Sequence, residues 1–229
     1  MIKDWIRKNA VYNKGNSIAY RCRKKRMEIF ERFYKEQVLA DISENSNGKI
    51  LDLGGSFEFW KVMGFKYIDM VSIVLLNLEK YEAPEECKNI SIVIGDATDL
   101  SQYGDKQFDV VFSNSVIEHV GGFENQQKMA EEMKRVGKHC FLQTPNKYFV
   151  IEPHFLFPFF SIMPLKLKVF CLKKFDMACC PRAKTNEEAF KYAESVRLMT
   201  KKELKSLFPG VKIRKEKFFF MTKSFYLYY

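Results

Sequence analysis

The sequence predicts an α/β fold built on a doubly wound, mostly parallel sheet. Continuous apolar runs that end in polar residues or glycine are typical of parallel strands buried on both faces. A later amphipathic segment at residues 124–136 leads into a fifth run at 139–143, and this alternation favours helices packed on both sides of one sheet. The first four apolar runs lie at residues 49–53, 70–76, 90–94 and 108–112.

Length and composition suit one folded domain with a sizeable core. The chain has 229 residues, of which 47% are hydrophobic and 15% aromatic, and this composition excludes a disordered polypeptide. Its formal net charge of +10 fits an anionic partner or surface, and it fits simple solubility equally well.

The turn after the first strand carries the clearest sign of a ligand site. Asp52 and the pair Gly54-Gly55 close an apolar run at the point where the chain must turn. Glycines there let backbone N–H groups approach a polar cofactor, and the neighbouring carboxylate can accept hydrogen bonds. A turn without a ligand stays open as an alternative, because every strand-to-helix connection of this kind needs a tight turn.

The next three strands also end in side chains that can bind a ligand. Because the carboxyl ends of parallel strands meet at one edge of a sheet, we expect these side chains to lie near Asp52. They are Asn77 and Glu79 after the second strand, Asp96 and Ala97 after the third, and Ser113, Asn114 and Ser115 at the fourth.

With Phe108-Asp109-Val110-Val111 followed by Ile117-Glu118-His119-Val120, the chain resembles the class I S-adenosylmethionine (SAM)-dependent methyltransferases, in their type 11-like branch. The resemblance covers about residues 49–146. It implies a Rossmann-like sheet of seven strands with an antiparallel last strand, and SAM as the cofactor. The cofactor-binding residues that it implies are Asp52, Gly54, Gly55, Asn77, Asp96, Ala97 and Asn114.

The resemblance gives some of these residues separate roles. Asp96 would hydrogen-bond the adenine amino group, and the backbone N–H of Ala97 would reach a ring nitrogen. Asn114 would lie beside the methionine part of the cofactor. Asn77 stands where the family places a carboxylate for the ribose hydroxyls, with Glu79 as the fallback. An amide can accept and donate there, but it lacks the strength of a charge-assisted hydrogen bond.

The glycine turn departs from the family pattern. Ser56 and Glu58 stand at the next two glycine positions after Gly54. The same departure argues against a nicotinamide-dependent oxidoreductase, because the dinucleotide-binding glycine pattern cannot be placed on this turn. A catalytically inactive relative, which uses the fold as a binding or membrane-associated module, stays open.

We expect a single methyltransferase domain over residues 1–229. Its parts are an N-terminal helical cap, a cofactor-binding core, an acceptor lid or interfacial insertion, and a final helix with a strand pair. Helices are predicted over 17–45, 116–120 and 124–136, and a capping box at Thr200 and Glu203 starts the last helix. The basic run at 21–26 fits a solvated helix face better than contacts with phosphates. The four parts span residues 1–48, 49–146, 147–199 and 200–229.

The insertion has a mixed apolar and basic character. Residues 151–165 are apolar and aromatic but are interrupted by three prolines. A bilayer-spanning helix needs about 20 apolar residues, so this segment is too short to span. An element lying on an anionic membrane and a lid packed on its own domain are equally favoured. The segment is followed by Lys166, Lys168, Lys173 and Lys174.

The acceptor is expected to be a small molecule, a sugar or a lipid-linked compound that is methylated at oxygen. The segment Glu152-Pro153-His154 with the aromatic residues after it is similar to methyltransferase-like proteins of cell-envelope polysaccharide and lipid pathways. His154 is the candidate catalytic base, because an imidazole titrates near neutrality, and Glu152 would orient it. A purely structural pairing of the two is the alternative. No motif for nucleic-acid binding is present. Glu118-His119 is typical of the resembled branch, but its histidine fits packing and hydrogen bonding as well as proton acceptance, so we assign it no catalytic role.

No metal site is expected from the sequence. The six cysteines form no Cys-x-x-Cys pair and have no histidine at ligand spacing, so reduced thiols are favoured. The first eight residues carry charges where a secretory signal needs an apolar core. We therefore expect a cytoplasmic protein, with peripheral attachment at the inner face of a membrane as a further option.

Overall fold

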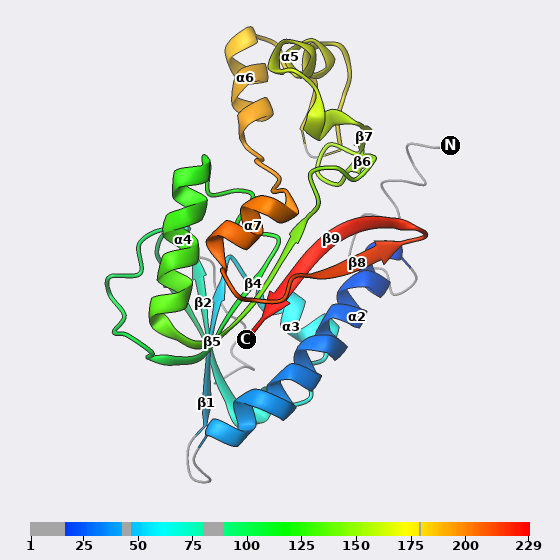
Figure 1. Cartoon of the computed structure of the whole chain (residues 1–229). Helices are drawn as coiled ribbons and strands as arrows, with labels where there is room; N and C mark the ends of the chain where they lie inside the picture. Colours follow the sequence, from blue (N-terminus) through cyan, green and yellow to red (C-terminus); the bar gives the residue numbers. More distant parts are fainter. Residues whose placement is uncertain (1–16, 43–46, 80–88, 179) are drawn as a thin grey trace.

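The computed structural model describes residues 17–42, 47–79, 89–178 and 180–229, so the charged start of the chain lies outside it. Its centre is a seven-stranded sheet with the order β3-β2-β1-β4-β5-β9-β8 (Figure 1). Strands β1 to β5 are parallel, whereas β9 runs antiparallel to β5 and β8. The predicted doubly wound, mostly parallel sheet is confirmed. The strands are β1 (Gly48–Leu53), β2 (Val71–Asn77), β3 (Ile90–Ile94), β4 (Phe108–Asn114), β5 (Gly137–Pro145), β8 (Arg214–Phe218) and β9 (Met221–Tyr228).

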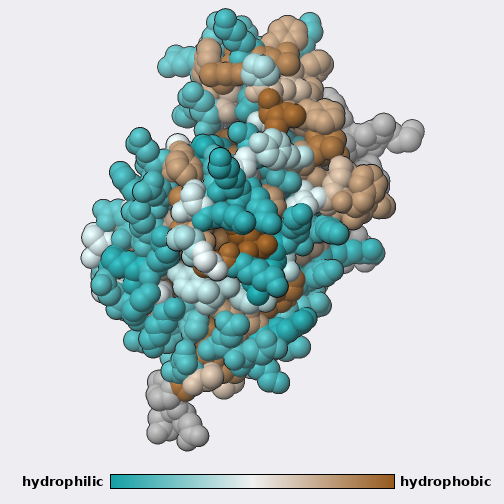
Figure 2. All heavy atoms as spheres, viewed as in Figure 1, coloured by the Kyte–Doolittle hydropathy of each residue, from teal (hydrophilic) through white to brown (hydrophobic). Residues whose placement is uncertain are grey.

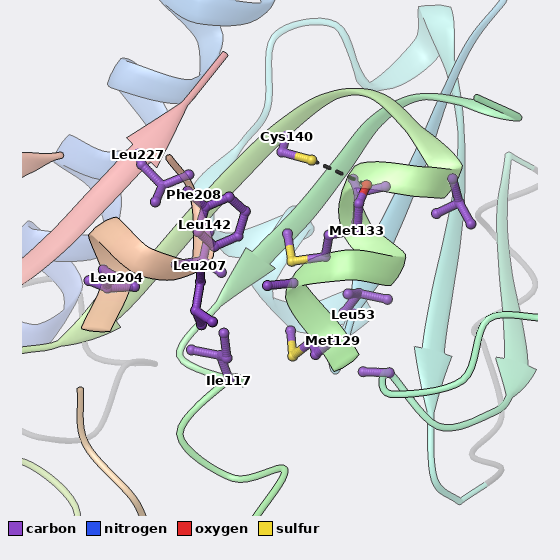
Figure 3. Close-up of a cluster of buried hydrophobic side chains, with 14 of the residues drawn as sticks. Leu53, Ile117, Met129, Met133, Cys140, Leu142, Leu204, Leu207, Phe208 and Leu227 are labelled. Atoms are coloured by element: carbon purple, nitrogen blue, oxygen red, sulfur yellow. Dashed lines mark hydrogen bonds between the residues drawn. The ribbon is translucent and has the colours of Figure 1, made fainter. Parts of the chain in front are cut away.

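Helices cover both faces of the sheet, and each face has its own core. On one face, α2 (Ile18–Phe33) and α3 (Phe57–Met63) bury a cluster rich in aromatic residues. The other face is covered by α4 (Phe123–Val136) and α7 (Lys201–Leu207), whose core contains the buried thiol of Cys140 (Figure 3). These two cores fix the strands whose carboxyl ends form the candidate site.

Side-chain caps start α2, α3 and α7. The hydroxyl of Ser17 accepts from the backbone N–H of Tyr20 at α2, and Thr200 with Glu203 forms the predicted capping box at α7. Ser56 caps α3, which gives a local reason for serine at a glycine position of the family pattern. Helix α2 continues through a π-helical turn and a 3-10 turn to Asp41. The predicted end of this helix lies partly outside the described residues.

The short helix predicted over 116–120 is wrong, because these residues form turns. Ser115 has a φ of 61°, in the left-handed region, so the chain cannot enter a helix smoothly from β4. Val116, Ile117 and Val120 are β-branched, which lowers their preference for a helix. The turn nevertheless places Glu118 and His119 directly after β4.

Residues between β5 and α7 form a small unit with a core of its own, at the top of Figure 1. The buried side chains of Phe155, Phe160 and Leu172 belong to this separate core. The predicted insertion is therefore folded on itself, although several large apolar side chains on it stay exposed. No helix among the described residues is long and apolar enough to cross a membrane. The elements of this unit are β6 (Ile151–Glu152), β7 (Phe157–Pro158), a 3-10 turn (Phe160–Ile162), α5 (Leu165–Lys174) and α6 (Asn186–Glu194).

Candidate functional site

The carboxylate of Asp52 is buried at the end of β1 and held by a neighbouring helix. The indole N–H of Trp60 in α3 donates to its Oδ2 at 2.8 Å. Burial raises the pKa of Asp52 to about 8, and the hydrogen bond from Trp60 opposes this shift. Asp52 thus supports the glycine turn from inside the protein.

Both positions of this turn require glycine. Gly54 has a φ of 67°, and its N–H donates to the carbonyl of Leu76 at 2.7 Å. A Cβ added at Gly55 would overlap the carboxylate of Asp52, so a larger residue cannot fit without a shift. The side-chain amide of Asn77 donates to the carbonyl of Gly55 at 3.0 Å. The turn is therefore fixed from β1, from α3 and from the end of β2.

A cavity of about 150 Å³ opens beside this turn. Four of the predicted residues, Asp52, Gly54, Gly55 and Asn114, line it, so the carboxyl ends of β1 and β4 meet there as expected. The glycine backbone and the polar lining suit a polar cofactor that is approached closely by the main chain. The other lining residues are Arg23, Ser56, Phe59 and Phe112.

A buried arginine positions Asn114. The guanidinium Nη1 of Arg26 donates to Asn114 Oδ1 at 2.7 Å and also to the side-chain oxygen of Gln143 in β5. Its Nε lies 3.2 Å from the carboxylate of Glu216 in β8. The prediction that the whole basic run at 21–26 is a solvated helix face is wrong for Arg26. Arg26 precedes Phe30 by four residues and Phe33 by seven. This helical spacing indicates that Arg26 lies on the buried face of α2.

Asp96 and Ala97 lie after β3 and are not in the lining of this cavity. Asp96 Oδ1 accepts from the backbone N–H and the hydroxyl of Thr98, both at 2.8 Å, and so stabilises a turn. The N–H of Gly95 donates to the carbonyl of Asn77 at 2.9 Å, which ties this turn to the end of β2. The structure thus connects Asp96 to the site through the neighbouring strand.

His154 belongs to a second group of polar residues. Its Nδ1 lies 2.7 Å from Glu152 Oε1, and its Nε2 lies 3.1 Å from Nε2 of His119. The same Nε2 is 3.9 Å from Oε1 of Glu118, which is fully buried. Thr144 at the end of β5 donates to the other oxygen of Glu118 at 2.9 Å. The expected pairing of Glu152 with His154 is present, whereas the contact with Glu118 and His119 was not predicted.

Burial and charge shift the pKa values of this group. Burial raises the pKa of Glu118 to about 7, against the opposing charge of His154. For His154, burial alone would lower the pKa, but the hydrogen bond and charge of Glu152, with the charge of Glu118, outweigh it and raise the pKa. Both groups are therefore strong proton acceptors for their residue types.

Comparisons with known proteins agree with this architecture. Residues 60–139 match the family model of a methyltransferase domain. No protein of curated function matches the sequence. The DszA carbon methyltransferase is similar with a TM-score of 0.60 and 12% identity, over 95% of this chain and 55% of its own.

Two other solved structures are similar at low sequence identity. The CurJ carbon methyltransferase matches with a TM-score of 0.52 and 8% identity, over 88% of this chain and 53% of its own. A SAM-dependent methyltransferase from Aquifex aeolicus matches with a TM-score of 0.44 and 13% identity, over 90% of this chain and 96% of its own. The chain thus spans about half the length of the two carbon methyltransferases. Residues 60–139 thus match a methyltransferase domain, and the chain shares the fold of solved class I methyltransferases.

Proposed function

We propose that the protein transfers a methyl group from SAM to a hydroxyl oxygen of a small-molecule, sugar or lipid-linked acceptor. The observation that carries the proposal is the placement of two polar groups at one edge of the sheet. The cavity at Asp52 lies at the ends of β1 and β4, and Glu118 follows β4 and is hydrogen-bonded to the end of β5. In open α/β sheets this edge is where ligands bind.

The cofactor would be held by the glycine turn and its neighbours. Gly54 and Gly55 would let the backbone approach it closely, and Asn114 would lie beside its methionine part. Asn77 would bind a ribose hydroxyl, and Asp96 with Ala97 would bind the adenine. SAM supplies an electrophilic methyl group that needs no further activation, so the protein mainly has to align the acceptor and exclude water.

His154 would take the proton of the acceptor hydroxyl. A proton on Nδ1 that is donated to Glu152 leaves Nε2 with its lone pair, and this nitrogen faces His119 and Glu118. A small cavity of about 90 Å³, lined in part by Glu152, Phe155 and Arg197, lies on the insertion side of this group. We propose that part of the acceptor binds in this cavity.

We also propose a cytoplasmic protein attached peripherally to an anionic membrane. Exposed apolar side chains gather on the insertion, in the upper part of Figure 2, and the ring of Phe149 near its start packs on Phe218 of β8. The adjoining hairpin tip carries Phe219 and Phe220, which are 80% and 88% exposed. Apolar side chains beside cations are typical of interfacial binding. The flanking lysines Lys166, Lys173 and Lys174 are exposed, whereas Lys168 lies over the ring of Phe160.

The test is labelled-methyl transfer from SAM to fractionated lipids and glycans of the native cell. Label should appear in one fraction, and His154→Ala and His154→Gln should each lower turnover about a hundredfold with unchanged SAM affinity. The matched control is His139→Ala, because His139 pairs with Asp41 away from the site. SAM binding without any transfer would favour the alternative, an inactive binding module. Normal turnover in both His154 variants would remove His154 from catalysis.

A further inference from the structure

Three metal-ligating side chains meet at the junction between the core and the insertion. Glu118, His119 and His154 each offer one ligand atom, and these atoms all lie within 4.8 Å of one another. Glu118 and His119 come from the turn after β4, whereas His154 comes from the insertion between β6 and β7. The exposed ring of His119 leaves this group accessible to solvent.

Both histidine rings are oriented from outside the group. Glu152 Oε1 lies 2.7 Å from Nδ1 of His154, and Glu152 is itself fixed by the backbone N–H groups of His154 and Phe155 at 2.8 and 2.6 Å. The ring of His119 interacts with the backbone of Ser195. A carboxylate or carbonyl on the far side of the ring is the usual partner of a histidine that ligates a metal, because it fixes the tautomer and the ring plane.

Glu118 has a buried oxygen that the protein leaves unpaired. Oε2 accepts from Thr144, but Oε1 has no hydrogen-bond partner among the described residues, and it points toward Nε2 of His154 at 3.9 Å. A buried carboxylate oxygen without a partner is costly. A hydrogen bond between the two histidines explains their 3.1 Å approach, but it does not satisfy this oxygen.

We propose that Glu118, His119 and His154 bind a divalent transition-metal ion such as Zn²⁺. Two ligands of tetrahedral zinc stand about 3.3 Å apart, close to the 3.1 Å between the histidine nitrogens. The carboxylate oxygen at 3.9 Å has to approach by about 0.6 Å to reach the same spacing. Two histidines, one glutamate and an open fourth position form the donor set of a catalytic rather than a structural zinc site.

A bound ion would connect the insertion to the core through His154. The open position would accept an oxygen, and here the inference rests on the proposed methyl transfer, because the acceptor hydroxyl would be that ligand. In the zinc-bound protein the ion would supply the Lewis acidity that lowers the pKa of the hydroxyl, and His154 would hold the ion; its role as a base, proposed above, applies to the protein without metal. Metal binding itself is independent of SAM and of any acceptor.

The experiment is titration of chelator-treated, full-length protein with Zn²⁺, without SAM or acceptor. Bound zinc is counted by elemental analysis and affinity is measured by calorimetry. One equivalent should bind. His119→Ala should weaken binding at least tenfold, and Glu152→Gln should weaken it about ten- to a hundredfold through the ring of His154. With Co²⁺ as a second probe, the wild type should give the intense visible absorption of a tetrahedral site.

The chain offers a matched control, because His139 is its only other histidine. His139→Ala should keep one equivalent at wild-type affinity, and the double variant His119→Ala/His154→Ala should bind none at this affinity. Circular dichroism checks that each variant is folded, and the exposed His119 gives a variant that should fold even if changes at His154 do not. No zinc bound by the wild type, or full binding by the folded His119→Ala variant, would overturn the proposal. Such a result would leave the methyl-transfer assay unaffected.

Discussion

The two halves of the candidate site are held in different ways. At the glycine turn, Asp52 bonds to α3, Asn77 bonds to Gly55, and Arg26 joins Asn114 to other strands. In the second half, His154 is held by Glu152 two residues earlier and meets the core at Glu118 and His119. The cofactor half is therefore preorganised by the sheet, whereas the acceptor half depends on a separately packed insertion. Changes in the first half should affect folding and cofactor binding together, and changes in the second should spare both.

The largest effect is expected from Gly55→Ala. The new methyl group would overlap the carboxylate of Asp52, which is held by Trp60 and cannot move without breaking that hydrogen bond. Overpacking of this kind typically costs about 1–3 kcal/mol of the free energy of unfolding. SAM binding, measured by calorimetry on the folded fraction, should be lost. Gly104→Ala in an exposed turn is the control, because its nearest neighbour is 3.8 Å from the added Cβ. A Gly55→Ala variant with wild-type melting temperature and SAM affinity would contradict a rigid cofactor half.

The pH dependence of stability tests how firmly Asp52 is buried. Its pKa is raised to about 8 in the folded protein, so the folded state keeps a proton that the unfolded chain releases above about pH 4. Stability should therefore fall as pH rises from about 4 to about 8, by up to about 1.4 kcal/mol per pH unit from this group. Asp52→Asn should remove this contribution and flatten the slope. Urea-induced unfolding of both proteins across this pH range measures the difference. If the free energy of unfolding changes with pH equally in both, Asp52 is solvated in the folded protein.

The strands were predictable because buried parallel strands leave continuous apolar runs. The third, at 90–94, is at the same residues in the structure, and the second is displaced by one residue to Val71–Asn77. The helix expected at 116–120 is absent because the left-handed Ser115 and β-branched neighbours favour a turn. A local pattern of polar caps cannot report the backbone conformation that the end of β4 imposes.

The candidate site was predictable only where topology alone positions its residues. Asp52 and Asn114 meet because they end neighbouring parallel strands. The contact of His119 with His154 joins residues 35 positions apart and depends on how the insertion folds, so no spacing in the sequence encodes it. Arg26 was assigned to solvent because its neighbours in the chain are basic, although its helical spacing placed it with the apolar residues of α2.

A smaller effect should follow from Asn77→Ala. The amide donates to Gly55 in the turn and is proposed to bind one ribose hydroxyl. The variant therefore loses one neutral hydrogen bond to the turn and one to the ribose. The free energy of SAM binding should weaken by about 1–2 kcal/mol, and the melting temperature should decrease slightly with it. Glu79→Ala, at the fallback position, should leave the affinity unchanged. If Glu79→Ala weakens SAM binding and Asn77→Ala does not, the ribose contact belongs to Glu79 and Asn77 does not bind the cofactor.

The smallest effect is expected at the hairpin tip that adjoins the insertion, and it tests whether this side of the protein faces a membrane. Phe219 and Phe220 are largely exposed, so Phe219→Ser and Phe220→Ser together remove apolar area without disturbing the core. We expect the tip to enter the membrane interface only in part. Affinity for anionic vesicles should therefore weaken about fivefold, which is less than the loss expected if both phenylalanines were fully buried in the membrane. Met70→Ser, at an exposed apolar position before β2, is the control. Co-sedimentation should also weaken with salt, because the lysines beside the apolar patch act through charge. Equal and weak binding of the wild type to anionic and neutral vesicles at low salt would make the insertion a lid for a soluble acceptor.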